Sequence, residues 1–113
     1  MNPGIVTDAA SLTLVHEPLP AEQVVAGAPT TGYLELDEIA GAGIGVWEHT
    51  PGTSTDVEAD EVFVVLSGSG TVAFDDPALA PITLAPGAVV RLTAGMKTVW
   101  TIDETLRKVY ISG

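Results

Sequence analysis

The sequence predicts one all-β domain, built as a sandwich or a closed barrel. Its 113 residues are enough for one hydrophobic core and too few for two. Val, Ile and Thr, which favour strands, are abundant, and no segment keeps a sustained helical spacing of apolar residues. Short apolar segments recur about every eight to eleven residues with a turn signal at each break, as is typical of these two architectures.

Residues 1–31 form a loosely patterned lead-in to this domain. Two short apolar stretches near the start suit edge strands, and Pro18, Pro20 and Pro29 interrupt the chain after them. Because proline has no amide to donate, such a segment belongs at a sheet edge. We therefore expect an N-terminal arm over 1–31, paired with its own sheet or a neighbour's, and a barrel over 32–113 in the same single domain.

The rest of the chain alternates between predicted strands and turns. Glycine and acidic residues predict turns at Gly68–Gly70 and Asp103–Thr105, and the polar segment 53–60 predicts a connection. In Tyr33–Asp37 the alternation predicts that Leu34 points inward. The predicted strands, in order, are 5–6, 12–15, 33–37, 44–49, 61–66, 71–74, 82–84, 88–92, 97–102 and 106–111.

Glu61 stands at the entrance of the central predicted strand, 61–66. Alternation places Glu61 on the same face as Phe63, and both faces of this strand are otherwise apolar. An isolated carboxylate in such surroundings costs several kcal/mol or has a raised pKa, so Glu61 needs a partner. We expect that partner to be Lys108, with both groups facing one cavity. The alternative is a buried ion pair that stabilises the barrel and does nothing else.

The charge distribution excludes several classes of partner. The formal net charge is −11, so nucleic acid and anionic membranes would be repelled. All four basic residues, Arg91, Lys97, Arg107 and Lys108, follow residue 90.

Cysteine is absent, which excludes disulfides and thiolate metal sites. No apolar run is long enough to span a membrane and the N-terminus has no basic signal segment, so a cytoplasmic location is the default expectation.

A series of short motifs runs in order through residues 33–111. They are Gly45–Glu48, Pro51-Gly52, Asp60-Glu61, Leu66–Gly68, Pro86-Gly87, Ala94-Gly95, Trp100 and Arg107–Tyr110. This series resembles the cupin superfamily, and most of all the small single-domain cupins grouped with the (S)-ureidoglycine aminohydrolase cupin domain. The resemblance implies a double-stranded β-helix, a jelly-roll barrel open at one end, which is usually assembled as a homodimer.

The resemblance also bears on metal binding. Metal-binding cupins hold one divalent ion with three histidines and one glutamate, and here Glu61 occupies the glutamate position and Thr98 the last histidine position. The other two positions fall on Thr55 and Val57, or with a longer spacer on Ser54 and Asp56. Because three of the four ligands are missing, we expect no cofactor. A divalent ion (Mn, Zn, Fe or Ni) would have to use Glu61 with His49.

Eight side chains are expected to line or support the barrel mouth, on the basis of strand alternation and the resemblance. They are Trp47, His49, Glu61, Phe63, Thr98, Trp100, Lys108 and Tyr110. Glu61, Lys108 and His49 are the candidate catalytic groups, and the other five are candidate ligand contacts. A mouth with aromatic rings, a carboxylate and an ammonium suits a small polar organic molecule.

Each of these residues also has a purely structural interpretation. Trp47 and Trp100 fill core or dimer-interface volume in that interpretation, as does Tyr110. His49 is then a hydrogen-bonded strand residue with no role as a base. The alternating acids over 56–60 are interpreted as a solvated strand face.

Two classes of function remain open on the sequence alone. The first is a binding module, a cupin with a degenerate metal site that holds a small molecule without turnover. The second is an enzyme, either a metal-dependent hydrolase of the ureidoglycine aminohydrolase type or a metal-free isomerase or hydrolase with Glu61 as acid/base. We favour the binding module, because the aminohydrolase chemistry needs a metal whose ligands are largely absent.

Overall fold

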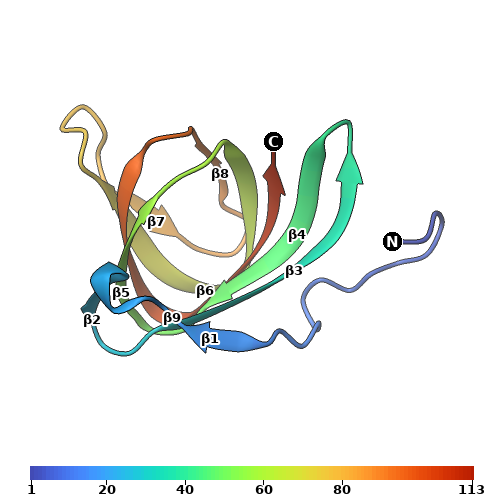
Figure 1. Ribbon diagram of the computed structural model, residues 1–113, viewed down its shortest axis with the longest axis horizontal. Coiled ribbons are helices and arrows are strands. Elements are labelled where there is room, and N and C mark those ends of the chain that lie inside the picture. Colours follow the sequence, from blue (N-terminus) through green and yellow to red (C-terminus); the bar gives the residue numbers. More distant parts are fainter.

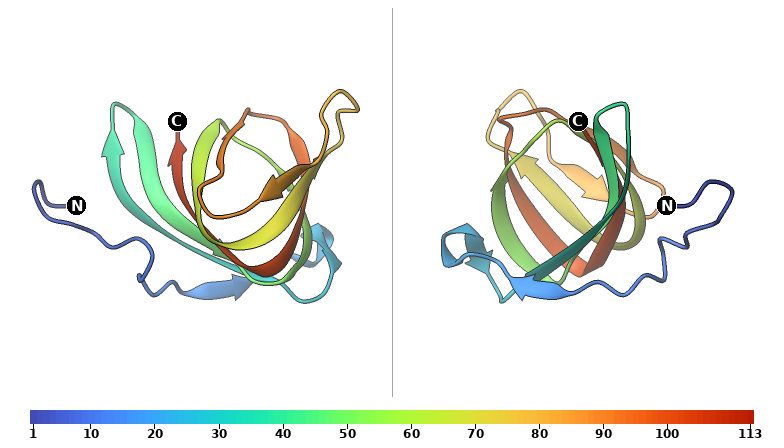
Figure 2. Two further views of the ribbon diagram at one scale, coloured as in Figure 1. Left: turned by 180° about the vertical axis from the view of Figure 1, so that it is seen from behind. Right: turned by 45° about the vertical axis from the view of Figure 1, so that its right-hand side comes forward.

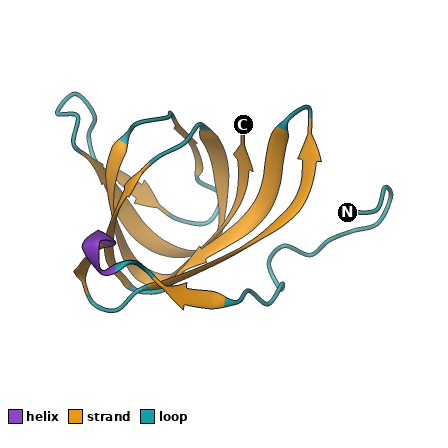
Figure 3. Cartoon of the chain, viewed as in Figure 1, coloured by secondary structure: helices purple, strands orange, loops and turns teal.

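Nine strands form one curled antiparallel sheet in the computed structural model, which describes residues 1–113 (Figure 1). The strands are β1 (His16–Pro18), β2 (Val24–Ala26), β3 (Thr30–Ile39), β4 (Ala42–His49), β5 (Gly52–Val57), β6 (Glu61–Phe74), β7 (Ile82–Leu84), β8 (Val89–Leu92) and β9 (Lys97–Ser112). The only helical element is one 3-10 turn, η1 (Ala21–Gln23) (Figure 3). No helix has the length and apolar character needed to cross a membrane. The all-β prediction is confirmed.

The long strand β9 organises the sheet. Its first half pairs with β5 and its second half with β4, while β6 pairs along its other edge. Strand β6 in turn pairs with β8 and then with β7, so the sheet curls into the barrel seen in Figures 1 and 2. Because paired residues share a sheet face, the register places Trp47 beside Lys108, Phe63 beside Tyr110 and Ser54 beside Trp100.

The predicted turns at Gly68–Gly70 and Asp103–Thr105 are wrong, because β6 and β9 each continue through them. The two segments lie opposite each other, and the β6–β9 register shifts repeatedly between Val65 and Gly70. Gly68 has a φ of +91°, and a Cβ on it would collide with the backbone of Thr105. The turn-forming residues therefore bend two paired strands together and do not reverse either one.

Two further segments differ from the sequence prediction. The polar segment 53–60, predicted as a connection, contains most of β5. Its inward residues face a polar pocket, so the strand lacks the apolar alternation by which strands are recognised. The predicted strands at 5–6 and 12–15 are absent, and the arm instead pairs through β1 with β3 and through β2 with β5.

The hydrophobic core lies inside the curl of the sheet. Its eight buried members are Phe63, Val65, Val72, Leu84, Leu92, Trp100, Ile102 and Leu106. The N-terminal arm lies outside the barrel, where Leu14 is buried and the guanidinium of Arg107 donates to the carbonyl of Ala9 (3.0 Å). Leu34, predicted to point inward, is exposed, because the register pairs it with Val46 on the sheet face opposite to that of Tyr33 and Trp47, which line the pocket. This arrangement leaves one end of the barrel open above the buried aromatic rings.

Candidate functional site

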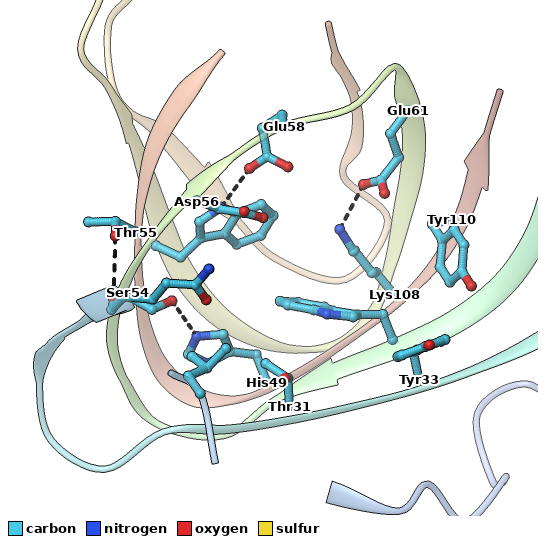
Figure 4. Close-up of a pocket in the computed structure, with 14 residues that line it drawn as sticks. Thr31, Tyr33, His49, Ser54, Thr55, Asp56, Glu58, Glu61, Lys108 and Tyr110 are labelled. Atoms are coloured by element: carbon cyan, nitrogen blue, oxygen red, sulfur yellow. Dashed lines mark hydrogen bonds and ion pairs between the residues drawn. The ribbon is translucent and has the colours of Figure 1, made fainter. Parts of the chain in front are cut away.

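A pocket of about 180 Å³ opens at one end of the barrel (Figure 4). Its walls come from β3, β4, β5, β6 and β9 and from the arm around η1. The lining residues are Leu19, Gln23, Thr31, Tyr33, Trp47, His49, Ser54, Thr55, Asp56, Glu58, Glu61, Trp100, Lys108 and Tyr110. Six of the eight sequence candidates are therefore in its wall, whereas Phe63 and Thr98 are buried and do not line it.

Lys108 and Glu61 meet inside the barrel. The Lys108 Nζ donates to Glu61 Oε2 at 2.7 Å, and only 5% of the lysine side chain is exposed. The same ammonium lies 4.4 Å from the ring centroid of Trp47, 4.3 Å from that of Phe63 and 4.9 Å from that of Trp100. The carboxylate and three ring faces thus replace the water that the ammonium loses on burial.

A second carboxylate, Glu58, is held against β9. Its Oε2 accepts hydrogen bonds from the hydroxyl of Thr98 (2.6 Å) and from the indole nitrogen of Trp100 (3.0 Å). Thr98 occupies the last histidine position of the cupin pattern, and here it anchors a carboxylate. The interpretation of Glu58 as part of a solvated strand face is therefore wrong. Asp60 does fit that interpretation, because it is exposed and pairs with Arg91 on the surface.

Asp56 is a third acidic group in the pocket wall. The pKa of its carboxyl is raised, mainly because the pocket wall removes hydration and secondly because the Glu58 carboxylate is close. The register of β5 with β9 pairs Asp56 with Thr98 and Ser54 with Trp100. Ser54 and Asp56 therefore lie on the same sheet face as Trp100 and Thr98. This is the face on which the cupin pattern with the longer spacer expects Ser54 and Asp56. That spacing was the sequence signal for both residues.

His49 is buried and fully hydrogen-bonded. Its Nδ1 donates to the carbonyl of Thr50 at 2.6 Å, so Nε2 is unprotonated and accepts from the hydroxyl of Ser54 at 2.8 Å. Burial lowers the pKa of His49, and the charge of Lys108 lowers it further against the opposing effect of the Thr50 carbonyl. The imidazole is therefore neutral, and neither nitrogen is free to act as a base or as a metal ligand.

The outer rim of the pocket combines β-strand tyrosines with the arm. Tyr110 lines it, and the pKa of its phenol is raised mainly by burial and next by the Glu35 carboxylate. Leu19 and Gln23 come from the arm, where the Gln23 carbonyl accepts a hydrogen bond from Thr55 (3.5 Å). Sequence reasoning missed both arm residues and Tyr33. Nothing local in the sequence links Leu19 and Gln23 to the barrel, because only tertiary pairing brings the arm to the mouth. Tyr33 was missed because the alternation of its predicted strand was phased with Leu34 inward, whereas the register places Tyr33 on the face of Trp47.

The donor set does not fit a divalent transition metal. With the longer spacer, which the register favours by placing Ser54 and Asp56 on the face of Trp100 and Thr98, the four positions of the cupin metal-binding pattern fall on Ser54, Asp56, Glu61 and Thr98. Three of them are already engaged, Ser54 by His49, Glu61 by Lys108 and Thr98 by Glu58. A dication at Glu61 would have to displace the ammonium of Lys108 or stay next to it. No group of three or more His, Cys, Asp or Glu side chains is arranged to hold a metal ion.

An open antiparallel barrel with its pocket at one end is the architecture of the cupins. The family model of the EutQ-like cupin domain matches residues 37–110, which is more than half of the chain. The protein therefore belongs to the EutQ-like cupin domain family. This finding confirms the predicted membership of the cupin superfamily.

Solved structures agree with this assignment at the level of the fold. The EutQ protein of Clostridium difficile is 17% identical, with a TM-score of 0.63 over 74% of this chain and 68% of that one. A putative ethanolamine utilization protein Q from Salmonella typhimurium is 14% identical (TM-score 0.63; 88% and 96% covered). A cupin-like protein from Thermotoga maritima is 16% identical (TM-score 0.65; 90% and 79% covered). No curated protein matches the chain significantly in sequence.

Proposed function

We propose that this protein binds a small polar organic molecule in the pocket of Figure 4, without a resident metal. The observation that carries the proposal is the cavity of about 180 Å³, which joins aromatic walls to a few convergent polar groups. Such a combination is typical of small-molecule sites. The Lys108–Glu61 pair supports the metal-free part, because it already neutralises the carboxylate that metal-binding cupins use as a ligand.

Tryptophan fluorescence is a direct test of binding. The chain contains two tryptophans, and Trp47 and Trp100 both line the pocket, so all of the tryptophan emission comes from its walls. We would titrate the protein with ureido compounds, amines, sugars and carboxylates, and we expect saturable changes with at least one class. A second titration on Trp47→Phe identifies the reporter. If no class changes the emission and NMR spectra stay constant too, the proposal is wrong.

Metal analysis tests the second part of the proposal. Protein purified without a histidine tag should contain far less than one equivalent of Mn, Zn, Fe or Ni, because Lys108 already occupies Glu61. Added metal should likewise leave the thermal unfolding midpoint unchanged. A stoichiometric metal in the purified protein would contradict the proposal and favour a metal-dependent hydrolase of the ureidoglycine aminohydrolase type.

A metal-free isomerase or hydrolase is the remaining enzymatic alternative. One observation favours it, since Glu61 reaches the pocket wall and is the carboxylate next to a fixed ammonium. The compounds that change the fluorescence would be incubated with the protein and followed by NMR. Product formation that is lost in Glu61→Gln would show that the protein is such an enzyme and not a binding module. We expect binding without turnover.

The proposal includes a homodimer and excludes nucleic acid and membranes as partners. An outer apolar face, formed by Val62, Val64, Val89 and Ile111, supports the dimer, because cross-strand pairing places these side chains together and the last two are exposed. The net charge of −11 supports the exclusion. Sedimentation at micromolar concentration should give a dimer, and a monomer would contradict it. A cytoplasmic location is proposed with them, to be checked by cell fractionation.

A further inference from the structure

Carboxylates outnumber cations in the wall of the pocket. Asp56, Glu58 and Glu61 line it, whereas Lys108 is its only lysine or arginine and is already paired with Glu61 at 2.7 Å. His49 adds no charge, because burial lowers its pKa and both of its nitrogens are hydrogen-bonded. The wall therefore keeps two carboxylates, Asp56 and Glu58, without a cationic partner.

These two carboxylates also have unused hydrogen-bond acceptors. Glu58 accepts its hydrogen bonds from Thr98 and Trp100 through Oε2, and its Oε1 receives none from the chain. Asp56 accepts the amide of Val57 through Oδ1 (2.8 Å), and its Oδ2 receives none. A ligand that fills this side of the pocket meets acceptors with negative charge. Positively charged N–H donors are the groups that complement them best.

A second observation is the way in which the barrel holds its own internal cation. The side chain of Lys108 is itself an alkylammonium, and it is buried between Glu61 and the ring faces of Trp47, Phe63 and Trp100. Trp47 and Trp100 are also part of the pocket wall, with ring centroids 5.5 Å apart. The surroundings offered to a ligand, the carboxylates of Asp56 and Glu58 with the two tryptophan rings, are thus of the same kind as those that hold the internal ammonium.

We propose that the ligand of this pocket is a small organic cation, a primary ammonium or a guanidinium, whose charged group binds between Asp56 and Glu58 with its carbon chain against the tryptophan rings. The inference rests on the proposed function and narrows it to one chemical class. The volume of about 180 Å³ lies below the ~300–1,000 Å³ of sites for drug-sized ligands, which favours a small ligand whose buried part is a short alkyl chain.

The test compares three probes that share a carbon skeleton and differ in charge: n-butylammonium, 1-butanol and butyrate. Each is titrated into the wild-type protein and followed by tryptophan fluorescence and by NMR at neutral pH. We expect saturable binding of n-butylammonium, affinity for 1-butanol lower by about tenfold or more, and no binding of butyrate. Butylguanidinium should behave like n-butylammonium.

Charge-neutral variants locate the cation. Asp56→Asn and Glu58→Gln should each weaken n-butylammonium binding by about tenfold or more, since each removes a charge-assisted hydrogen bond. Asp103→Asn is the matched control, because it removes the same charge from an exposed residue outside the pocket and should leave the affinity within about twofold. Circular dichroism of all three variants checks the fold. Asp56→Asn provides a test that leaves the hydrogen bonds from Thr98 and Trp100 to Glu58 unchanged.

The outcomes separate this inference from the proposed function. If 1-butanol or butyrate binds as tightly as n-butylammonium, or if Asp56→Asn and Glu58→Gln bind like Asp103→Asn, the cation assignment is wrong and small-molecule binding stands. If no probe and no compound of the wider library binds, both proposals are wrong. Selective, saturable n-butylammonium binding that depends on Asp56 and Glu58 supports both.

Discussion

The ammonium of Lys108 is the one cation held inside the barrel, beside the carboxylate of Glu61. It is paired with Glu61, nearly fully buried and surrounded by three aromatic rings. Removing one partner of a buried pair costs more than the pair contributes, because the other charge is left without compensation. The Asp60–Arg91 pair, with both side chains more than half exposed, has no such cost.

This contrast predicts that replacing the buried Lys108 lowers the free energy of unfolding far more than replacing the exposed Arg91. Lys108→Met should lower the free energy of unfolding by about 3 kcal/mol, because Glu61, whose side chain is only 17% exposed, is then left without a partner. Arg91→Met should lower it by less than about 1 kcal/mol. Urea unfolding measures both. Adding Glu61→Gln to Lys108→Met should recover most of the loss, and equal losses for the two single variants would contradict the assignment of Lys108 to a buried site.

His49 predicts a pH dependence of stability. Its folded-state pKa is lowered from the ordinary 6.5, so the unfolded chain binds the proton first as the pH falls. The stability contribution of the neutral ring is complete above pH 6.5 and is lost progressively as the pH drops below that value toward the folded pKa. Imidazole ¹⁵N shifts should show a neutral ring at pH 6.5, and His49→Gln should show a shallower fall of the unfolding midpoint. Titration of the ring at or above 6.5 would exclude this mechanism.

At the level of single strands, Gly68 determines how the barrel closes. Strands β6 and β9 stay paired through their bends, and the backbone of Gly68 approaches that of Thr105 too closely for any side chain. Its positive φ adds a second reason for glycine. Gly87 has nearly the same φ of +92° but lies in an open turn, where a Cβ would meet no other atom within 4 Å.

Substitutions of these two glycines therefore distinguish the cost of backbone strain from the cost of a steric collision. Gly87→Ala should lower the free energy of unfolding by about 1 kcal/mol, the ordinary cost of a side chain in the left-handed region. Gly68→Ala should lower it by about 3 kcal/mol or more, because the methyl group also displaces β9. Urea unfolding of both variants gives the comparison. A loss for Gly68→Ala no larger than that for Gly87→Ala would mean that the paired bends tolerate a side chain.

Across the molecule as a whole, the acidic charge opposes folding. Fifteen acidic residues face four basic ones, and three acids meet in one pocket. Like charges in a compact state repel each other more than in an expanded chain. The pocket adds to this repulsion, and a cationic ligand would relieve part of it.

Salt should consequently stabilise the protein. Raising NaCl from about 10 mM to about 300 mM shortens the Debye length from about 30 Å to well below 10 Å, which screens the surface acids. We expect the thermal unfolding midpoint to rise over this range and then to level off. Asp56→Asn should start from a higher midpoint at neutral pH, because it removes the acid whose pKa is raised by the pocket wall. A midpoint that falls with added NaCl would show that attractive pairs outweigh the repulsion.

The sequence predicted the pairs that depend on alternation along a single strand. It placed Glu61 and Lys108 on inward faces, and the structure brings their charged atoms into contact. It also placed the aromatic residues near them. It did not predict β5 as a strand or Glu58 as a pocket residue, because polar side chains facing a polar cavity look like a solvated loop in a linear pattern.

Local residue types and their spacing were enough to predict most strand-forming segments, and the resemblance carried by the short motifs predicted the cupin superfamily. Three other features required the folded chain: Gly68 and Thr105 bend paired strands, the arm reaches the pocket rim, and Lys108 fills the place beside Glu61. Each of these depends on contacts between residues far apart in the chain. Their register is set by the pairing of β9 with β4, β5 and β6, which no single segment specifies.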